Sequence, residues 1–532
     1  MSNINPIELN LFSSRVSSVC DEMGLVLKRA AFSPNIKDRL DFSCALFGPK
    51  GELFAQADHM PVHLGSMAFA MGSIIKATDW KKGDMLVFND PFLGGTHLPD
   101  VTLVSPAFDN SGERIGFVAN RAHHADIGCD TPGSMPVSST LEEEGIIIPP
   151  VLLLRDEKVQ SKAARLLNLK SNRLTGDFAA QVGANRVGIL RFEGLVNKLG
   201  LLNYEDNMKQ LNSFAERIAI KTISSLSPGV YWFNDFLDDD GYGARNINLS
   251  VKLTIDAKRV ELDFSDSADM VDGNLNCPES VVAAAGLYCF RCLMPANAPA
   301  CAGLFRPITI KTRLGSILNA KRPAAVAAGN VETSMRLVDL VFGALAKAAP
   351  SRIAAASQGT MNNIAMGQID TIKNSRWDYY ETIGGGMGGG PRFPGLGGVH
   401  SHMTNTLNTP VESLEMHYPL RIRRYELRKG SGGRGEHDGG DGIIREYEFM
   451  EKTQVSLLSE RRARRPWGIN GGGEGDKGIN LLNGKVLPAK SVVTLKKGDL
   501  LTIMTPGGGA WNSAKKARKA SFDDTDKSLP IL

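Results

Sequence analysis

The sequence predicts a mixed α+β fold of several lobes, with a β-rich lobe towards the C-terminal end. Three patterns carry this prediction: an apolar repeat of helical spacing near the N-terminus, hairpin-like runs after it, and alternating apolar runs from about residue 443 onward. A chain of 532 residues is too long for one simple core. We therefore expect about two to four closely joined portions.

The first element is a predicted helix. Asn5 and Pro6 form a start signal, because a capping Asn is followed by Pro in the first turn. Apolar side chains then recur every three or four positions from Phe12 to Ala30, which is typical of an amphipathic helix packed on a core. Residues 42–55 follow as a predicted hairpin, and residues 67–77 as a helix.

The rest of the chain changes character several times. Residues 145–148 are predicted to form a short strand that two prolines end, and residues 157–225 are predicted to be helical. The part from Pro228 is predicted to be β-rich, with helices at about 279–294 and 335–348. We predict an N-terminal α+β portion over 1–225, a middle α/β portion over 226–440, a β-rich lobe over 441–512 and a mobile tail over 513–532.

Composition excludes several function classes. The chain is 42% apolar and 22% charged, as expected of a soluble globular protein, and its net charge is only +4. Basic stripes and RNA-binding motifs are absent from the sequence, so we expect no nucleic-acid partner and no membrane surface. Seven scattered cysteines, an odd number, fit a reducing cytoplasm. No signal-peptide pattern or membrane-length apolar run is present.

Glycine-rich segments at 384–390 and 431–435 look at first like phosphate-binding loops. Neither completes the GxxxxGK[ST] pattern or a dinucleotide-binding fingerprint. We interpret them as turns where backbones pass closely, and we predict no nucleotide site in this chain.

Histidines and carboxylates gather on two loops that follow strand-like segments. His97 and Asp100 share one turn, which Pro99 favours, and His123 and His124 follow about twenty residues later. His and Asp suit zinc, manganese or iron, and a third ligand from the second loop would leave positions open for water. The alternative is that these are hydrogen-bonded structural residues, the interpretation we prefer for the earlier His63.

Several ordered motifs together resemble the hydantoinase B/oxoprolinase family. The resemblance extends to about residue 510, and Cys129 stands where relatives often have a glycine. The motifs are Lys37–Cys44, His59–Met67, Asn89–Pro91, Gly94–Asp100, His123–Gly128, Gly145–Pro150, His402–Thr406 and Thr505–Gly509.

This resemblance implies a division of labour between two subunits. A hydantoinase A-type partner, carrying ATP and Mg, would phosphorylate the carbonyl oxygen of a small cyclic amide, and this chain would hydrolyse the activated ring within a hetero-oligomer. We expect a divalent ion at His97, Asp100 and His123 that activates a water molecule. Asp41 is either a further ligand or a carboxylate of the turn before residues 42–55. His124 or Asp126 would orient a ligand or accept a proton.

Two other functions stay open at this stage. The family includes acetone and acetophenone carboxylase subunits, although acetone carboxylase subunits of this kind are considerably longer than this chain. A non-catalytic scaffold for the kinase-like subunit is the third hypothesis, and it would not need the histidine and carboxylate cluster.

Overall fold

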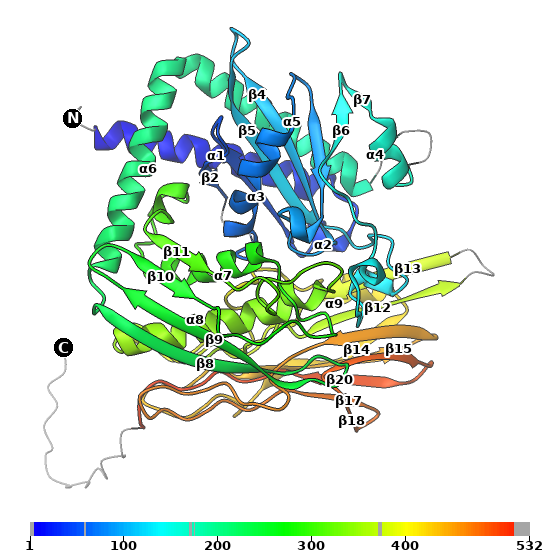
Figure 1. Cartoon of the computed structure of the whole chain (residues 1–532). Coiled ribbons are helices and arrows are strands. Elements are labelled where there is room, and N and C mark those ends of the chain that lie inside the picture. The colour runs from blue at the N-terminus through cyan, green and yellow to red at the C-terminus, as the bar shows by residue number, and fades with distance from the viewer. Residues whose placement is uncertain (1–4, 58–59, 170–172, 175, 371–374, 515–532) are drawn as a thin grey trace, which may run out of the picture.

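The N-terminal part of the chain forms a seven-stranded sheet (Figure 1). The computed structural model describes residues 5–57, 60–169, 173–174, 176–370 and 375–514. Every neighbouring pair in this sheet is antiparallel. In spatial order the strands are β2 (Leu53–Gln56), β1 (Phe42–Phe47), β5 (Arg114–His123), β4 (Asp100–Phe108), β3 (Met85–Phe88), β6 (Val151–Arg155) and β7 (Lys158–Val159).

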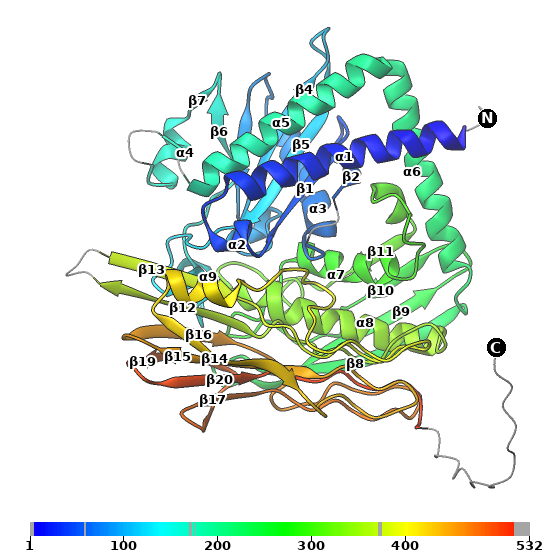
Figure 2. The ribbon, with the colours of Figure 1, turned by 180° about the vertical axis from the view of Figure 1, so that it is seen from behind.

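Helices cover both faces of this sheet. In β1, Cys44 and Leu46 belong to the apolar core shared with α1 (Pro6–Ala30), whereas Ala45 and Phe47 belong to the core shared with α3 (His63–Ala77). Successive side chains of a strand point to opposite faces, so a strand buried on both sides is apolar throughout. Figure 2 shows α1 and α5 (Gly176–Leu199) crossing the same face of the sheet.

The predicted N-terminal elements are confirmed. The Asn5 side chain accepts a hydrogen bond from the backbone of Ile7, which caps the first helix. Strands β1 and β2 form the predicted hairpin. The predicted helical region contains α4 (Ser161–Leu166), α5 and α6 (Leu201–Ile223), and a short α2 (Pro34–Lys37) leads into the hairpin.

The middle of the molecule is built on two buried helices, α7 (Glu279–Arg291) and α8 (Ser334–Ala348), close to their predicted positions. Helix α7 packs between α3 and α8. A Cβ on Gly65 of α3 would lie 3.1 Å from the Cα of Ala284, so glycine permits this close approach. Helix α8 packs on a four-stranded sheet in the order β11 (Ile308–Lys311), β10 (Val260–Asp263), β9 (Arg245–Ile255) and β8 (Gly229–Asp239).

Two further sheets form the C-terminal side of the molecule (Figure 1). The first has the order β13 (Ser375–Glu381), β12 (Asn363–Asp370), β16 (Thr453–Leu458) and β19 (Lys490–Leu495). The second has the order β14 (Leu420–Arg428), β15 (Gly442–Phe449), β20 (Leu500–Met504), β17 (Ile479–Leu482) and β18 (Lys485–Leu487), and α9 (Val411–His417) packs on β14.

Glycine-rich segments cross one another beside these sheets. A Cβ on Gly386 would lie 2.0 Å from the carbonyl oxygen of Gly440 and 2.1 Å from the backbone nitrogen of Gly508. No side chain fits between backbones at that separation. The interpretation of these segments as close backbone passages is therefore confirmed.

One strand prediction is wrong. Residues 145–148 form no strand, and the strand β6 begins only at Val151. Bonds to two loops replace a ladder here. The Asn89 amide donates to the carbonyl of Ile146 and accepts from the backbone nitrogen of Ile148, and the backbone nitrogen of Ile146 donates to the carbonyl of Ile127. Pro149 and Pro150 have no N–H to extend a ladder.

The α+β class with several lobes is confirmed. The boundaries at 225 and 440 stay predictions, although β12 and β13 from before residue 440 share a sheet with β16 and β19 from after it. Most of the predicted mobile tail, from residue 515 onward, lies outside the described residues. In the described part of the chain, no helix is long and apolar enough to cross a membrane.

Candidate active site

Three neighbouring strands place predicted site residues at one end of the seven-stranded sheet. Asp100 begins β4 and is paired with His123, the last residue of β5. The backbone nitrogen of His123 donates to the carbonyl of Asp41, which directly precedes β1, over 3.0 Å. The antiparallel register therefore brings the loop of Asp100, the loop of His123 and the segment of Asp41 together. The sequence could only suggest that they are close.

His97 and Asp100 form the predicted turn. The backbone nitrogen of Asp100 donates to the carbonyl of His97 over 3.1 Å, and His97 Nε2 lies 3.4 Å from Asp100 Oδ1. The other carboxylate oxygen lies 3.3 Å from His63 Nε2 and accepts from the Thr96 hydroxyl over 2.5 Å. Asp100 is thus the centre of what we call the histidine–aspartate cluster: Asp41, His63, His97, Asp100 and His123.

Burial and neighbouring charges set the charge states of this cluster. Burial would raise the pKa of Asp100, but His97 and His63 beside it hold that pKa well below its ordinary value. Burial lowers the pKa of His97, and the Asp100 carboxylate outweighs it, so the pKa of His97 is raised. Burial and repulsion from His97 lower the pKa of His123 well below its ordinary value. The arrangement favours a charged His97–Asp100 pair beside a neutral His123.

A small cavity adjoins the cluster. Its volume is about 10 Å³, which gives room for about one water molecule or one ion. Residues that are distant in the sequence close it: Asn330 from the π-helical turn Gly329–Thr333, Tyr380 from β13, and Thr404 and Thr406 from the loop before α9. A π-helical turn at a helix start is a common feature of functional sites.

The ring of His123 is held on two sides. It stacks on Tyr380 with ring centroids 4.9 Å apart and an interplanar angle of 6°. Its Nδ1 lies 3.1 Å from the side-chain nitrogen of Asn35. The tautomer of His123 depends on which end of the Asn35 amide faces the ring. When the amide nitrogen faces it, Nδ1 accepts and the proton is on Nε2. When the amide oxygen faces it, Nδ1 donates and Nε2 is free to bind a metal.

Ring nitrogens without partners support the fit of a metal ion. His97 Nδ1 and His123 Nε2 are buried without a partner among the described residues, and His97 Nε2 has no hydrogen bond, only its ion-pair contact with Asp100 at 3.4 Å. Buried polar atoms are normally satisfied, so these three need an explanation. Imidazole nitrogens beside carboxylates are a donor set suited to zinc, manganese or iron. In their present positions, however, no three His, Cys, Asp or Glu side chains of the described residues are arranged as a complete metal site.

His124 and Asp126 lie outside the lining of this cavity. His124 Nε2 lies 2.9 Å from the Gln181 side-chain oxygen, and its ring packs on Phe178. Asp126 lies on an exposed turn, where its carboxylate accepts from the backbone nitrogen of Gly128 over 2.8 Å. Their catalytic roles stay predictions.

The hydrogen-bonded structural role preferred for His63 agrees with its two partners, whereas neither Asn330 nor Tyr380 is predicted from the sequence as a site residue. The His63 ring joins Ser43, at 2.9 Å from Nδ1, to Asp100, so it is part of the cluster. A single His at a helix start has no distinguishing spacing. Thr404 and Thr406, from the motif His402–Thr406, line the cavity, so this distant motif lies beside the cluster.

The sequence and the fold both match known proteins. A family model described as Hydantoinase B/oxoprolinase matches residues 5–514, and the chain belongs to this family. It is 40% identical to 5-oxoprolinase 1 of Arabidopsis thaliana over 95% of this chain and 42% of that protein. It is 39% identical to 5-oxoprolinase of Dictyostelium discoideum over 96% of this chain and 40% of that protein. The chain thus spans about two fifths of the length of these relatives.

Other relatives are nearer to this chain in length. A protein named as a putative subunit of a D-/L-hydantoinase, from a Pseudomonas strain, is 28% identical over 96% of this chain and 91% of its own. The solved structure of ATP-dependent caprolactamase from Pseudomonas jessenii superimposes with a TM-score of 0.87 at 24% identity, over 96% of this chain and 92% of that chain. The latter likeness establishes a shared fold.

Proposed function

We propose that this chain is the hydrolytic subunit of an ATP-dependent cyclic-amide hydrolase of the hydantoinase, 5-oxoprolinase or lactamase type. Family membership and 5-oxoprolinase relatives at about 40% identity support the reaction class. One structural observation carries the assignment of the site: the buried Asp100 carboxylate lies between His97 and His63, beside ring nitrogens without partners and next to a cavity of water size.

The proposal divides the reaction between two subunits. A hydantoinase A-type partner would bind ATP and Mg and transfer a phosphoryl group to the ring carbonyl oxygen, which makes the amide carbon a better electrophile. This chain has no complete phosphate-binding loop in its sequence and spans about two fifths of the 5-oxoprolinases. The relative that is named as one subunit of a hydantoinase also supports a separate partner.

The histidine–aspartate cluster would act on the attacking water molecule. Asp41, His97, Asp100 and His123 are the residues we assign to a zinc, manganese or iron ion. Such an ion, when bound, supplies a Lewis acid that lowers the pKa of water towards about 7. His63 and Thr96 fix the Asp100 carboxylate, and Asn35 and Tyr380 fix the His123 ring. Orienting groups of this kind usually matter to a site nearly as much as the ligands.

The proposal is tested with the chain and a hydantoinase A-type partner purified together. We expect ATP-dependent ring opening of 5-oxoproline or hydantoin, reduced at least about 100-fold in His97→Ala. His417→Ala is the matched control, because His417 is exposed on α9 and bonded only locally to the carbonyl of Ser413. Its rate should equal that of the unchanged protein.

Two outcomes would contradict the proposal. Unchanged ring opening in His97→Ala, with the complex assembled, would indicate a scaffold. ATP-dependent incorporation of bicarbonate into acetone or acetophenone, without opening of any cyclic amide, would indicate a carboxylase.

A further inference from the structure

One buried arginine lies behind the candidate active site and has no role in the proposed function. Arg39 is fully buried, and its guanidinium carbon lies 4.8 Å from the centroid of the Tyr380 ring. Its two terminal nitrogens donate to the carbonyl of Tyr380 over 2.8 Å and to the hydroxyl of Thr382 over 3.1 Å. Tyr380 and Thr382 both line the water-sized cavity, so Arg39 supports the wall of this cavity from behind.

A third contact of Arg39 concerns the side chain that faces His123. Arg39 Nη1 lies 3.4 Å from the Asn35 side-chain oxygen, and the Asn35 side-chain nitrogen lies 3.1 Å from His123 Nδ1. A guanidinium group only donates hydrogen bonds, whereas an amide has one accepting end and one donating end. The accepting end of Asn35 must therefore face Arg39, and its donating end must face His123. The arginine thus decides the orientation of the amide, which the imidazole ring alone leaves open.

This orientation determines which nitrogen of the His123 ring carries the proton. A ring nitrogen that faces an N–H donor must accept, so Nδ1 has a lone pair and the proton is on Nε2. The Nε2 atom is buried, and the His123 ring lines the cavity. In this tautomer the ring presents an N–H group to the cavity and has no lone pair on Nε2 for a metal ion.

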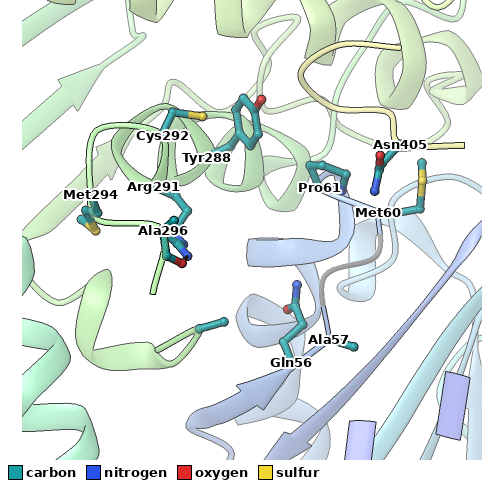
Figure 3. Close-up of a pocket in the computed structure, with 11 residues that line it drawn as sticks. Gln56, Ala57, Met60, Pro61, Tyr288, Arg291, Cys292, Met294, Ala296 and Asn405 are labelled. Atoms are coloured by element: carbon teal, nitrogen blue, oxygen red, sulfur yellow. Dashed lines mark hydrogen bonds between the residues drawn. The ribbon is translucent and has the colours of Figure 1, made fainter. Parts of the chain in front are cut away.

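Arg39 and Asn35 line neither the cavity nor the larger pocket beside it. This pocket has a volume of about 410 Å³ and shares Met60 with the cavity. Figure 3 shows Met60 on one side of the pocket and Tyr288 of α7 on the other. An effect of Arg39 or Asn35 on an ion in the cavity must therefore be transmitted by the His123 ring.

We propose that Arg39, through Asn35, fixes His123 in the tautomer protonated on Nε2, and that a metal ion binds His123 Nε2 only when the Asn35 amide turns round. The inference rests on the proposed function in one respect, because that function assigns His123 to the ion. Turning the amide places its N–H groups against the guanidinium and removes the acceptor of a buried donor, which is costly. Arg39 is thus a positioning residue that lowers the affinity of the site for metal.

The tautomer of His123 tests the inference without a metal ion, ATP or a partner. Solid-state ¹⁵N NMR of the full chain, labelled at its histidines and freed of metal with a chelator, distinguishes protonated from unprotonated ring nitrogens. The signals of His123 are those that are lost in His123→Gln. We expect a protonated Nε2 and an unprotonated Nδ1. A protonated Nδ1 in the unchanged chain would overturn the inference.

Substitutions separate the polarity of these contacts from their bulk. Arg39→Met removes the donor and should give a mixture of the two tautomers, whereas Arg39→Lys keeps a group that only donates and should keep the proton on Nε2. Asn35→Asp introduces a carboxylate that accepts from both neighbours, so the proton should move to Nδ1, and this variant tests the inference even when Arg39→Met does not fold. Asn203→Asp makes the same change on the exposed face of α6 and is the matched control.

Zinc affinity, measured by titration against a competing chelator, is the second readout. In Asn35→Asp the Nε2 lone pair is available without any turn of the amide, so zinc should bind about tenfold more tightly than to the unchanged chain or to Asn203→Asp. An unmoved proton in Asn35→Asp, or an affinity that does not rise in it, would overturn the inference. Expected tautomers without zinc binding by any of these chains would instead contradict the metal assignment of the proposed function.

Discussion

Two buried polar regions of this molecule differ in how completely they are paired. The buried charge network joins β8, α8, the segment after β16 and the start of β19, and consists of Asp235, Arg336, Asp339, Glu460, Arg461 and Lys490. Its three cations and three carboxylates are all linked by ion pairs of 2.6–3.3 Å, although Arg336 Nε, Asp339 Oδ1 and Arg461 Nε have no hydrogen bond of their own. The histidine–aspartate cluster is equally buried, but the His123 ring has no ion-pair partner among the described residues, and neither His97 Nδ1 nor His123 Nε2 has a hydrogen bond.

From this difference we infer a structural role for the network and a site at the cluster. Buried charges are tolerated when they are paired, and the network links elements from distant parts of the chain. A buried ring nitrogen without a partner needs an explanation, such as a bound water molecule or ion. Burial and charge alone do not distinguish the two regions.

Breaking the network should produce the largest change in stability. Arg336→Met leaves Asp235 and Glu460 partly unpaired inside the protein, and should lower the free energy of unfolding by about 3 kcal/mol or more. Asp100→Asn should cost less than half of this, because the pKa of His97 is raised by Asp100 and His97 can lose its proton when the carboxylate is removed. Urea unfolding followed by circular dichroism measures both. Equal losses would remove the distinction between the two regions.

Glu332 follows the cavity residues Asn330 and Val331. It should make the stability of the folded protein depend on pH, in a direction that follows from its pKa. Burial raises its pKa to about 7. This pKa is higher than that of the same carboxyl in the unfolded chain, so folding favours the protonated form. Its contribution to stability is therefore lost as pH rises through about 7.

Glu332→Gln should therefore reduce the loss of stability between pH 5 and pH 8 by about 2 kcal/mol. Thermal unfolding at the two pH values measures this change. The Met361 backbone and the Asn363 side chain both donate to Glu332 Oε1, and a glutamine oxygen can accept both bonds. An unchanged pH dependence in the variant would show that another group controls it.

The smallest expected effect concerns the orientation of one ligand. Asn35→Leu removes the amide that faces His123 Nδ1, while Tyr380 still stacks on the ring. An ion at His123 Nε2 requires the proton on Nδ1 and the Asn35 oxygen as its acceptor, so the amide must turn when the ion binds. Without this acceptor metal affinity should fall about tenfold, as is usual when a group that orients a ligand is lost. Titration against a competing chelator measures it, and Asn207→Leu on the exposed face of α6 is the control. An unchanged affinity would show that Asn35 does not orient this ring.

The sequence predicted the elements whose signals are local. Helix α1 has its cap, its proline and its apolar repeat within a single segment, and β1 and β2 have their turn between them. The wrongly predicted strand at 145–148 shows where local signals mislead. The backbone of this isoleucine run bonds to the side chain of Asn89 and does not pair with a neighbouring strand.

For a related reason, only part of the candidate site could be predicted from the sequence. Asp41, His97, Asp100 and His123 lie within about eighty residues of one another, in motifs that could be recognised together. Asn330 and Tyr380 lie more than two hundred residues further along the chain. Their approach to His123 depends on the packing of α8 and β13, which no spacing in the sequence encodes.

We propose that the histidine–aspartate cluster holds a divalent metal ion, and elemental analysis of the purified chain tests this. The comparison is between the unchanged chain, the His97→Ala, Asp100→Ala double variant and the His417→Ala control. We predict about one equivalent of zinc, manganese or iron in the unchanged chain and the control, and none in the double variant. Equal metal content in the double variant, or none in the unchanged chain after reconstitution with all three metals, would contradict the account.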